Sequence, residues 1–267
     1  MSGYVHGYDG REALRLKDQA RTLEELLHGD TRFPDGAEVL EAGCGTGAQT
    51  VTLAHHSPCA HITAVDVSAA SLAEARARIA AAGIGNVTFR QADLLAAPFA
   101  PASFDHVFLC FVLEHLPDPT AVLAALRPVL RPGGTITAIE GDHGSTYFHP
   151  ESEAARAAIA CQVELQCRAG GDANIGRRLY PLLAGVGFGA VRVSPRMVYV
   201  DASRPALVDG FIRRTFTAMI EGVRDSAIAA GLSTPDAFDA GTRALHRTAG
   251  SDGVFCYTFF KAMGQAT

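Results

Sequence analysis

The residues best suited to chemistry gather around one glycine-rich turn. Residues 39–47 read VLEAGCGTG, an apolar segment that runs straight into the turn, and a helical pattern follows it. Glycine lets a backbone approach a ligand closely and take a positive φ without steric cost, and the helix behind the turn offers unpaired N–H groups. Asp66 ends the next predicted strand 21 residues after Gly45, where its carboxylate could accept hydrogen bonds from a ribose diol. The spacing therefore predicts a site for a nucleotide-like cofactor.

The turn alone does not decide which cofactor binds. Gly43, Gly45 and Ala48 also satisfy the G-x-G-x-x-G/A pattern of dinucleotide sites. A nicotinamide-dependent oxidoreductase would use the same glycines and the same Asp66. Both interpretations stay open at this point.

Composition narrows the class of protein. The 267 residues are 48% hydrophobic and 19% charged, which predicts a sizeable buried core, and the formal charge of −5 disfavours nucleic acid as the main partner. The longest apolar run, Val107–Leu113, is far shorter than the roughly 20 residues of a membrane span. The first residues lack an apolar signal segment, so we expect a cytoplasmic protein with free thiols. Six cysteines and ten histidines show no metal-ligand spacing, so no metal is expected.

The elements that must position the turn alternate between strand and helix. Strands are predicted at 37–42, 62–66, 87–91, 104–111 and 134–140, with helices at 48–56 and 68–82 and around 123–130. Such alternation predicts a doubly wound, mostly parallel α/β sheet. Later strands are expected at 190–200 and 254–261, and an amphipathic helix at 10–28. No long linker appears, and we expect a single domain.

Further motifs distinguish between the two cofactors. The chain resembles the class I S-adenosylmethionine-dependent methyltransferases through five segments in order: the glycine motif from Leu40 to Gly47, Asp66, Val87–Leu94 with Asp93, the stretch Phe104–Val107 with Val112–Leu116, and Leu126–Gly134. The oxidoreductase alternative leaves Glu41, Asp93 and the last segment unexplained.

The resemblance implies a fold and a cofactor site. It implies a Rossmann-like sheet of seven strands with an antiparallel last strand and helical lid insertions. It divides the single domain into an N-terminal cap (1–30), a cofactor-binding core (37–141), insertions (142–176 and 203–250) and segments that complete the sheet (177–200 and 254–263). It also implies a set of residues in contact with S-adenosylmethionine: Tyr8, Glu41, Gly43, Gly45, Asp66, Asp93, Leu94, Cys110, Phe111 and His115.

Candidates for the chemistry lie just after the fifth predicted strand. Residues 140–149 hold many titratable and hydroxyl groups, and glycines at 141 and 144 would let this loop approach a ligand. We predict His143 as a general base or acceptor-orienting group, supported by Glu140 and His149. Tyr8 is a further candidate on the N-terminal cap. A polar surface loop is the alternative interpretation of 140–149.

These features predict methyl transfer from S-adenosylmethionine to a small apolar or aromatic metabolite, with a phenol or an indole as attractive acceptors. Apolar residues at 211–223 favour such an acceptor because they predict an apolar lid. A protein that binds the cofactor without methylating is the second alternative. The chain could be a monomer or a homodimer.

Overall fold

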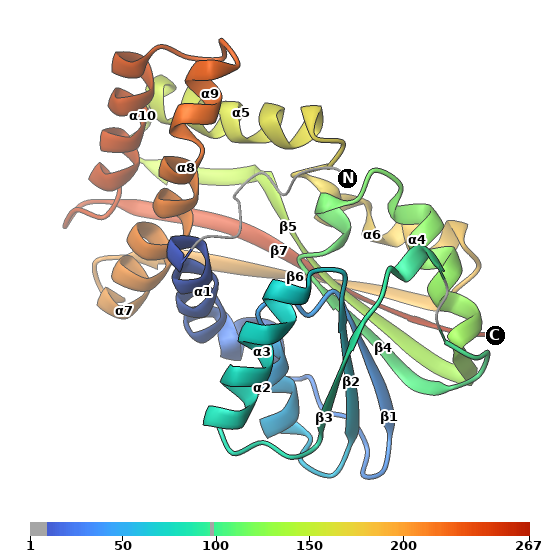
Figure 1. Cartoon of the computed structure of the whole chain (residues 1–267). Helices are drawn as coiled ribbons and strands as arrows, with labels where there is room; N and C mark the ends of the chain where they lie inside the picture. The colour runs from blue at the N-terminus through green and yellow to red at the C-terminus, as the bar shows by residue number, and fades with distance from the viewer. Residues whose placement is uncertain (1–9, 97–98) are drawn as a thin grey trace.

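A twisted seven-stranded sheet organises the molecule (Figure 1). The computed structural model describes residues 10–96 and 99–267, and the strand order is β3-β2-β1-β4-β5-β7-β6. All strands run parallel except β7, which pairs antiparallel with β5 and β6. The predicted fold class is confirmed. The strands are β1 Glu38–Ala42, β2 His61–Asp66, β3 Val87–Gln91, β4 Phe104–Cys110, β5 Leu130–His149, β6 Gly189–Asp201 and β7 Val254–Gln265.

Helices cover both faces of the sheet and its extended end (Figure 1). In the parallel half, side-chain caps start two of them: Ser68 accepts from the N–H of Ser71 at 3.1 Å and Asp118 from the N–H of Ala121 at 2.9 Å. The α-helices are α1 Gly10–His28, α2 Ala48–His56, α3 Ala69–Ala81, α4 Pro119–Leu126, α5 Glu153–Arg168, α6 Leu179–Gly185, α7 Pro205–Leu207, α8 Ala218–Gly222, α9 Arg224–Ala229 and α10 Pro235–Arg247. None of the described helices combines the length and apolar character that a bilayer crossing requires.

Strand β5 is much longer than the sequence indicates. The predicted strand ends at Glu140 and a polar loop follows, but β5 continues to His149 and pairs with β7 as far as Val254. The register shifts between Asp142 and Tyr147. The expectation of a loop is wrong because polar side chains of this segment are buried and paired: Asp142, for example, is 3% exposed and accepts two hydrogen bonds from Arg177, at 2.8 and 2.6 Å.

The expected insertion between β6 and β7 is helical and consists of several short pieces. After α7 comes η5, a π-helix over Val208–Thr217, and α8, α9 and α10 follow. π-helical turns are rare and are frequent at functional sites. Because η5 packs against α1, it brings a late part of the chain beside the N-terminal helix.

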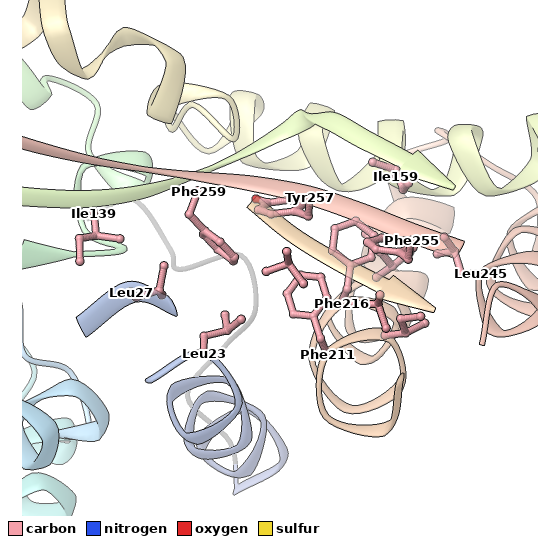
Figure 2. Packing of buried hydrophobic residues seen from close by; sticks show 14 of the residues in the cluster. Leu23, Leu27, Ile139, Ile159, Phe211, Phe216, Leu245, Phe255, Tyr257 and Phe259 are labelled. Atoms are coloured by element: carbon pink, nitrogen blue, oxygen red, sulfur yellow. The ribbon is translucent and has the colours of Figure 1, made fainter. Parts of the chain in front are cut away.

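An aromatic core joins the extended strands to η5 and α1 (Figure 2). Phe255, Tyr257 and Phe259 of β7 face Phe211 and Phe216 of η5, with ring centroids 4.8 Å apart for Phe216 and Phe255. All five side chains are at most 3% exposed. Burying such large apolar surfaces is a dominant source of stability. This core therefore fixes the helical segment over one end of the sheet.

Candidate active site

A cavity of about 760 Å³ opens at the carboxyl ends of β1, β2 and β4. Parallel α/β sheets place ligands at this edge. Nine of the ten residues predicted to hold the cofactor line this cavity: Glu41, Gly43, Gly45, Asp66, Asp93, Leu94, Cys110, Phe111 and His115. Tyr8, the tenth, lies outside the described residues.

The glycine turn is shaped so that side chains would obstruct it. Gly43 has φ +79°, and a Cβ there would stand 2.7 Å from Cγ2 of Val112. Gly45 has φ +52° and no atom within 4 Å of the position of a Cβ. The backbone of Gly45 therefore faces open space in the cavity, as a site for close ligand approach requires.

Asp66 ends β2 as a fixed acceptor beside the turn. Its Oδ2 accepts the N–H of Gly45 at 2.8 Å, and its Oδ1 accepts the N–H of Ser68 at 2.8 Å. These bonds orient the carboxylate toward the cavity that it lines. Asp93, after β3, is exposed and accepts the N–H of Leu95 at 2.9 Å. Two carboxylates are thus held at neighbouring strand ends.

Glu41 differs from these two acids because it is buried. It is 3% exposed, and burial, with a contribution from the charge of Asp66, raises the pKa of Glu41 to about 7. Its Oε2 has no hydrogen-bond partner among the described residues. A buried carboxyl group of this kind is suited to a cationic ligand group, which would stabilise its ionised form.

The end of β4 forms one wall of the cavity in a strained conformation. Phe111 has φ +58°, in the left-handed region, and its N–H donates to Ile139 O at 2.9 Å. Glu140 holds the next two residues: its Oε1 accepts the N–H of Val112 at 3.0 Å and that of Leu113 at 2.8 Å. Glu140 is fully buried and does not line the cavity. The structure therefore does not bring it together with His143, contrary to the expectation from sequence.

His143 lies in the cavity wall and has a tyrosine partner. Its Nδ1 is 2.8 Å from Oη of Tyr257, the two rings meet edge to face, and the His143 side chain is buried. Its Nε2 has no hydrogen-bond partner among the described residues. His149, predicted to support it, is exposed at the far end of β5 and does not line the cavity. Of the predicted catalytic residues described, only His143 reaches the site.

Beyond the glycine turn the cavity has an aromatic side and a polar side. Phe211, Phe216 and Met219, which the sequence indicates as an apolar lid, line it. Ile220 and Val223 are instead fully buried in the core. The lining residues that the sequence interpretation missed include Glu114, Gln166, Tyr257 and Phe259.

The polar side rests on α5. Nε2 of Gln166 donates to the backbone oxygen of Glu114 at 2.9 Å and lies 3.3 Å from its Oε2. Gln162, one turn earlier, donates to Oε1 of Gln166 at 3.0 Å. The available sequence signal was the spacing of four residues between Gln162 and Gln166 in a helical segment, which places both side chains on one face of the helix.

Comparison with known proteins agrees with this geometry. Residues 39–134 match the family model described as a methyltransferase domain. The 27-O-demethylrifamycin SV methyltransferase of Amycolatopsis mediterranei is 31% identical over 132 residues, 49% of this chain and 48% of that protein. An uncharacterised 37.1 kDa protein in a transposon of Streptomyces fradiae is 31% identical over 214 residues, 79% of this chain and 61% of that protein.

Solved structures support the fold. Phosphoethanolamine N-methyltransferase 2 of Haemonchus contortus, solved with S-adenosyl-L-methionine, superposes with a TM-score of 0.58 at 19% identity, over 92% of this chain and 52% of that chain. The present chain spans about half to three fifths of the length of the two relatives matched by sequence. The match of residues 39–134 to a methyltransferase domain agrees with the family that the sequence resembles.

Proposed function

We propose that this protein transfers a methyl group from S-adenosylmethionine to a small, apolar or aromatic metabolite of the phenol or indole kind, with S-adenosylhomocysteine as the second product. The observation that carries the proposal is the continuity of one cavity. The glycine turn with Asp66 and Asp93 lies at one end, and His143 and an aromatic side lie at the other. A cofactor and an acceptor could therefore meet without leaving the protein.

The residues at the first end fit the cofactor. Open space beside Gly45 accommodates a ligand close to the backbone, and Asp66 is oriented to accept from a ribose diol. The family resemblance implies that Asp93 contacts the adenine and that Glu41 lies beside the methionine ammonium group. The buried Oε2 of Glu41, which has no partner among the described residues, agrees with a cationic group at that place.

The chain itself contributes position and shielding. When bound, the cofactor supplies an electrophilic methyl group on a positively charged sulfur, which becomes a neutral thioether after transfer. Phe211, Phe216 and Phe259 exclude water from the acceptor end, and His143 is placed to orient the acceptor. Alignment and water exclusion are the main demands of such a displacement.

Calorimetric titration with S-adenosylmethionine and S-adenosylhomocysteine tests the proposal. We expect the natural sequence to bind both ligands and Asp66→Ala to lose at least about tenfold in affinity, because a charge-assisted hydrogen bond disappears. Asp225→Ala is the matched control, because that side chain is 95% exposed and lies outside the cavity. Thermal unfolding of each variant shows whether it is folded.

Product analysis separates the alternatives. Incubation with phenols and indoles should give products heavier by about 14 Da, the mass of one CH₂ group, and a variant unable to bind should give none. Binding of NAD in place of both sulfur ligands would favour the oxidoreductase. Tight binding of S-adenosylmethionine without any methylated product would favour the non-methylating alternative.

A further inference from the structure

His143 and Tyr257 form a buried, hydrogen-bonded pair in the wall of the acceptor cavity. The Nδ1 of His143 is 2.8 Å from the Tyr257 hydroxyl, and both side chains are buried. Gly141 makes room for the pair, since a Cβ there would stand 2.3 Å from the Tyr257 hydroxyl oxygen. The chain therefore keeps a glycine in β5 where any other residue would displace the tyrosine.

Both members of the pair are neutral near pH 7. Burial lowers the pKa of His143 below its usual range, against the charges of Glu114 and Asp142, while Arg15 and His115 act in the same direction as burial. Burial also raises the pKa of Tyr257 well above its usual range. A neutral imidazole has one N–H, so only one of its nitrogens can be the acceptor.

The contact with Tyr257 admits two arrangements. Either the Tyr257 hydroxyl donates to a bare Nδ1 and the imidazole hydrogen resides on Nε2, or Nδ1–H donates to the Tyr257 oxygen and Nε2 is bare. An imidazole nitrogen is a better acceptor than a phenol oxygen, and a phenol O–H is a better donor than a neutral imidazole N–H, so the first arrangement is favoured.

We propose that Tyr257 is a positioning residue that fixes His143 as a hydrogen-bond donor to the methyl acceptor, and that the acceptor is a phenol or another oxygen-bearing aromatic compound rather than an indole. The proposal rests on the proposed function, because it concerns the acceptor end of the same cavity. His143 lines the same cavity as Phe211, Phe216 and Phe259, and its Nε2 is buried without a hydrogen-bond partner among the described residues. A phenol oxygen can accept the Nε2 hydrogen, whereas an indole N–H would place donor against donor. His143 then orients the acceptor and takes no proton from it: the phenol releases its proton to solvent, and the Nε2–H donates to the resulting phenolate oxygen, which receives the methyl group.

Nitrogen NMR of the free protein tests the proton position directly. Protein labelled with ¹⁵N-histidine, with the His143 signals assigned through His143→Gln, should show Nε2 protonated and Nδ1 unprotonated at pH 7. Tyr257→Phe should change the His143 signals to a mixture of both tautomers, because the donor to Nδ1 is gone. Tyr199→Phe is the matched control, since Tyr199 is a partly exposed tyrosine of β6 outside the cavity, and it should leave the signals unchanged.

This readout does not depend on the cofactor or on turnover. A spectrum of the natural sequence with Nδ1 protonated and Nε2 bare would overturn the proposal and make His143 a candidate base. If Tyr257→Phe does not fold, the tautomer of the natural sequence still decides. Failure to bind S-adenosylmethionine would reject the proposed function while leaving the tautomer result intact.

Acceptor probes test the consequence for recognition. In the presence of S-adenosylhomocysteine, 2-naphthol should bind about tenfold more tightly than naphthalene, which corresponds to one buried hydrogen bond. His143→Phe should remove this difference, and His143→Gln, which keeps an N–H donor, should retain part of it. Equal affinities for 2-naphthol and naphthalene in the natural sequence, or tighter binding of indole than of 2-naphthol, would contradict the donor role.

Discussion

At the scale of single residues, the carboxyl groups around the glycine turn differ in burial and in hydrogen bonding. Asp66 is half-buried and its two oxygens accept N–H groups from Gly45 and Ser68. Glu41 is 3% exposed, and burial raises its pKa to about 7. At pH 6 Glu41 is therefore mostly protonated in the free protein. A cationic ligand group beside it would favour the ionised form, so ligand binding and proton binding at this residue should be linked.

We expect Glu41 to lose its proton when S-adenosylmethionine binds. A neighbouring ammonium lowers the pKa of the carboxyl group, so at pH 6 up to about one proton passes to the buffer. The sign follows from the same shift: because binding releases a proton, affinity should rise as the pH rises from about 5 to about 7 and level off above the pKa of the free protein. Calorimetry at pH 6 in two buffers of different ionisation enthalpy measures the number of protons released.

Glu41→Gln provides the control for this linkage. Glutamine keeps the shape of the side chain and cannot titrate, so the variant should release no proton in this range and its affinity should depend less on pH. The same proton count in both proteins would assign the linkage to another group. A proton taken up by the natural sequence on binding would contradict the expected direction.

At the scale of elements, the junction between β4 and β5 determines one wall of the site. Glu140 of β5 accepts two N–H groups directly after the left-handed Phe111, at Val112 and Leu113. Burial raises the pKa of Glu140 well above its usual range, and the charge of Glu114 acts in the same direction. Because Glu140 accepts these two N–H groups and does not line the cavity, it serves to hold the chain rather than to exchange protons with an acceptor.

Substitutions at Glu140 distinguish a structural role, in which it binds two backbone N–H groups, from a catalytic role. Glu140→Gln keeps an acceptor oxygen for both N–H groups and should change the free energy of unfolding by less than about 1 kcal/mol, with turnover largely retained. Glu140→Ala leaves two buried N–H groups unpaired and should cost about 2–4 kcal/mol, with weaker cofactor binding. Urea denaturation and steady-state kinetics measure the two effects. A fully stable Glu140→Gln variant without turnover would instead assign Glu140 a catalytic role.

The same junction shows where sequence reasoning succeeds and where it stops. Alternating strands and helices predict β1 to β4, and the motif residues Glu41, Asp66 and Asp93 reach one cavity because parallel strands share an edge. The extension of β5 was not predictable, since its polar residues are buried only through distant partners such as Arg177, 35 positions from Asp142. The pairing of His143 with Tyr257 spans 114 positions and carries no local signal.

At the scale of the whole molecule, the ends of the chain share one core. The largest cluster of buried apolar residues contains Leu23 of α1, Val39 of β1, Ile159 of α5, Phe211 of η5 and Phe255 of β7. Elements from the proposed cap, core and insertions therefore bury the same surface. Segments that share a core unfold together, because none of them keeps its apolar contacts once the others have unfolded. This arrangement supports the proposed single domain.

We therefore expect one calorimetric unfolding transition that shifts as a whole when S-adenosylhomocysteine is added. A ligand present at about 100 times its dissociation constant stabilises the folded state by about 2.7 kcal/mol, which for a domain of this size raises the midpoint by about 5–10 °C. The Asp66→Ala variant should unfold in one transition with little shift, because it loses ligand affinity and keeps the core. Two separated transitions, with only the first moved by the ligand, would show instead that the helices between β6 and β7 form a unit that unfolds independently of the sheet.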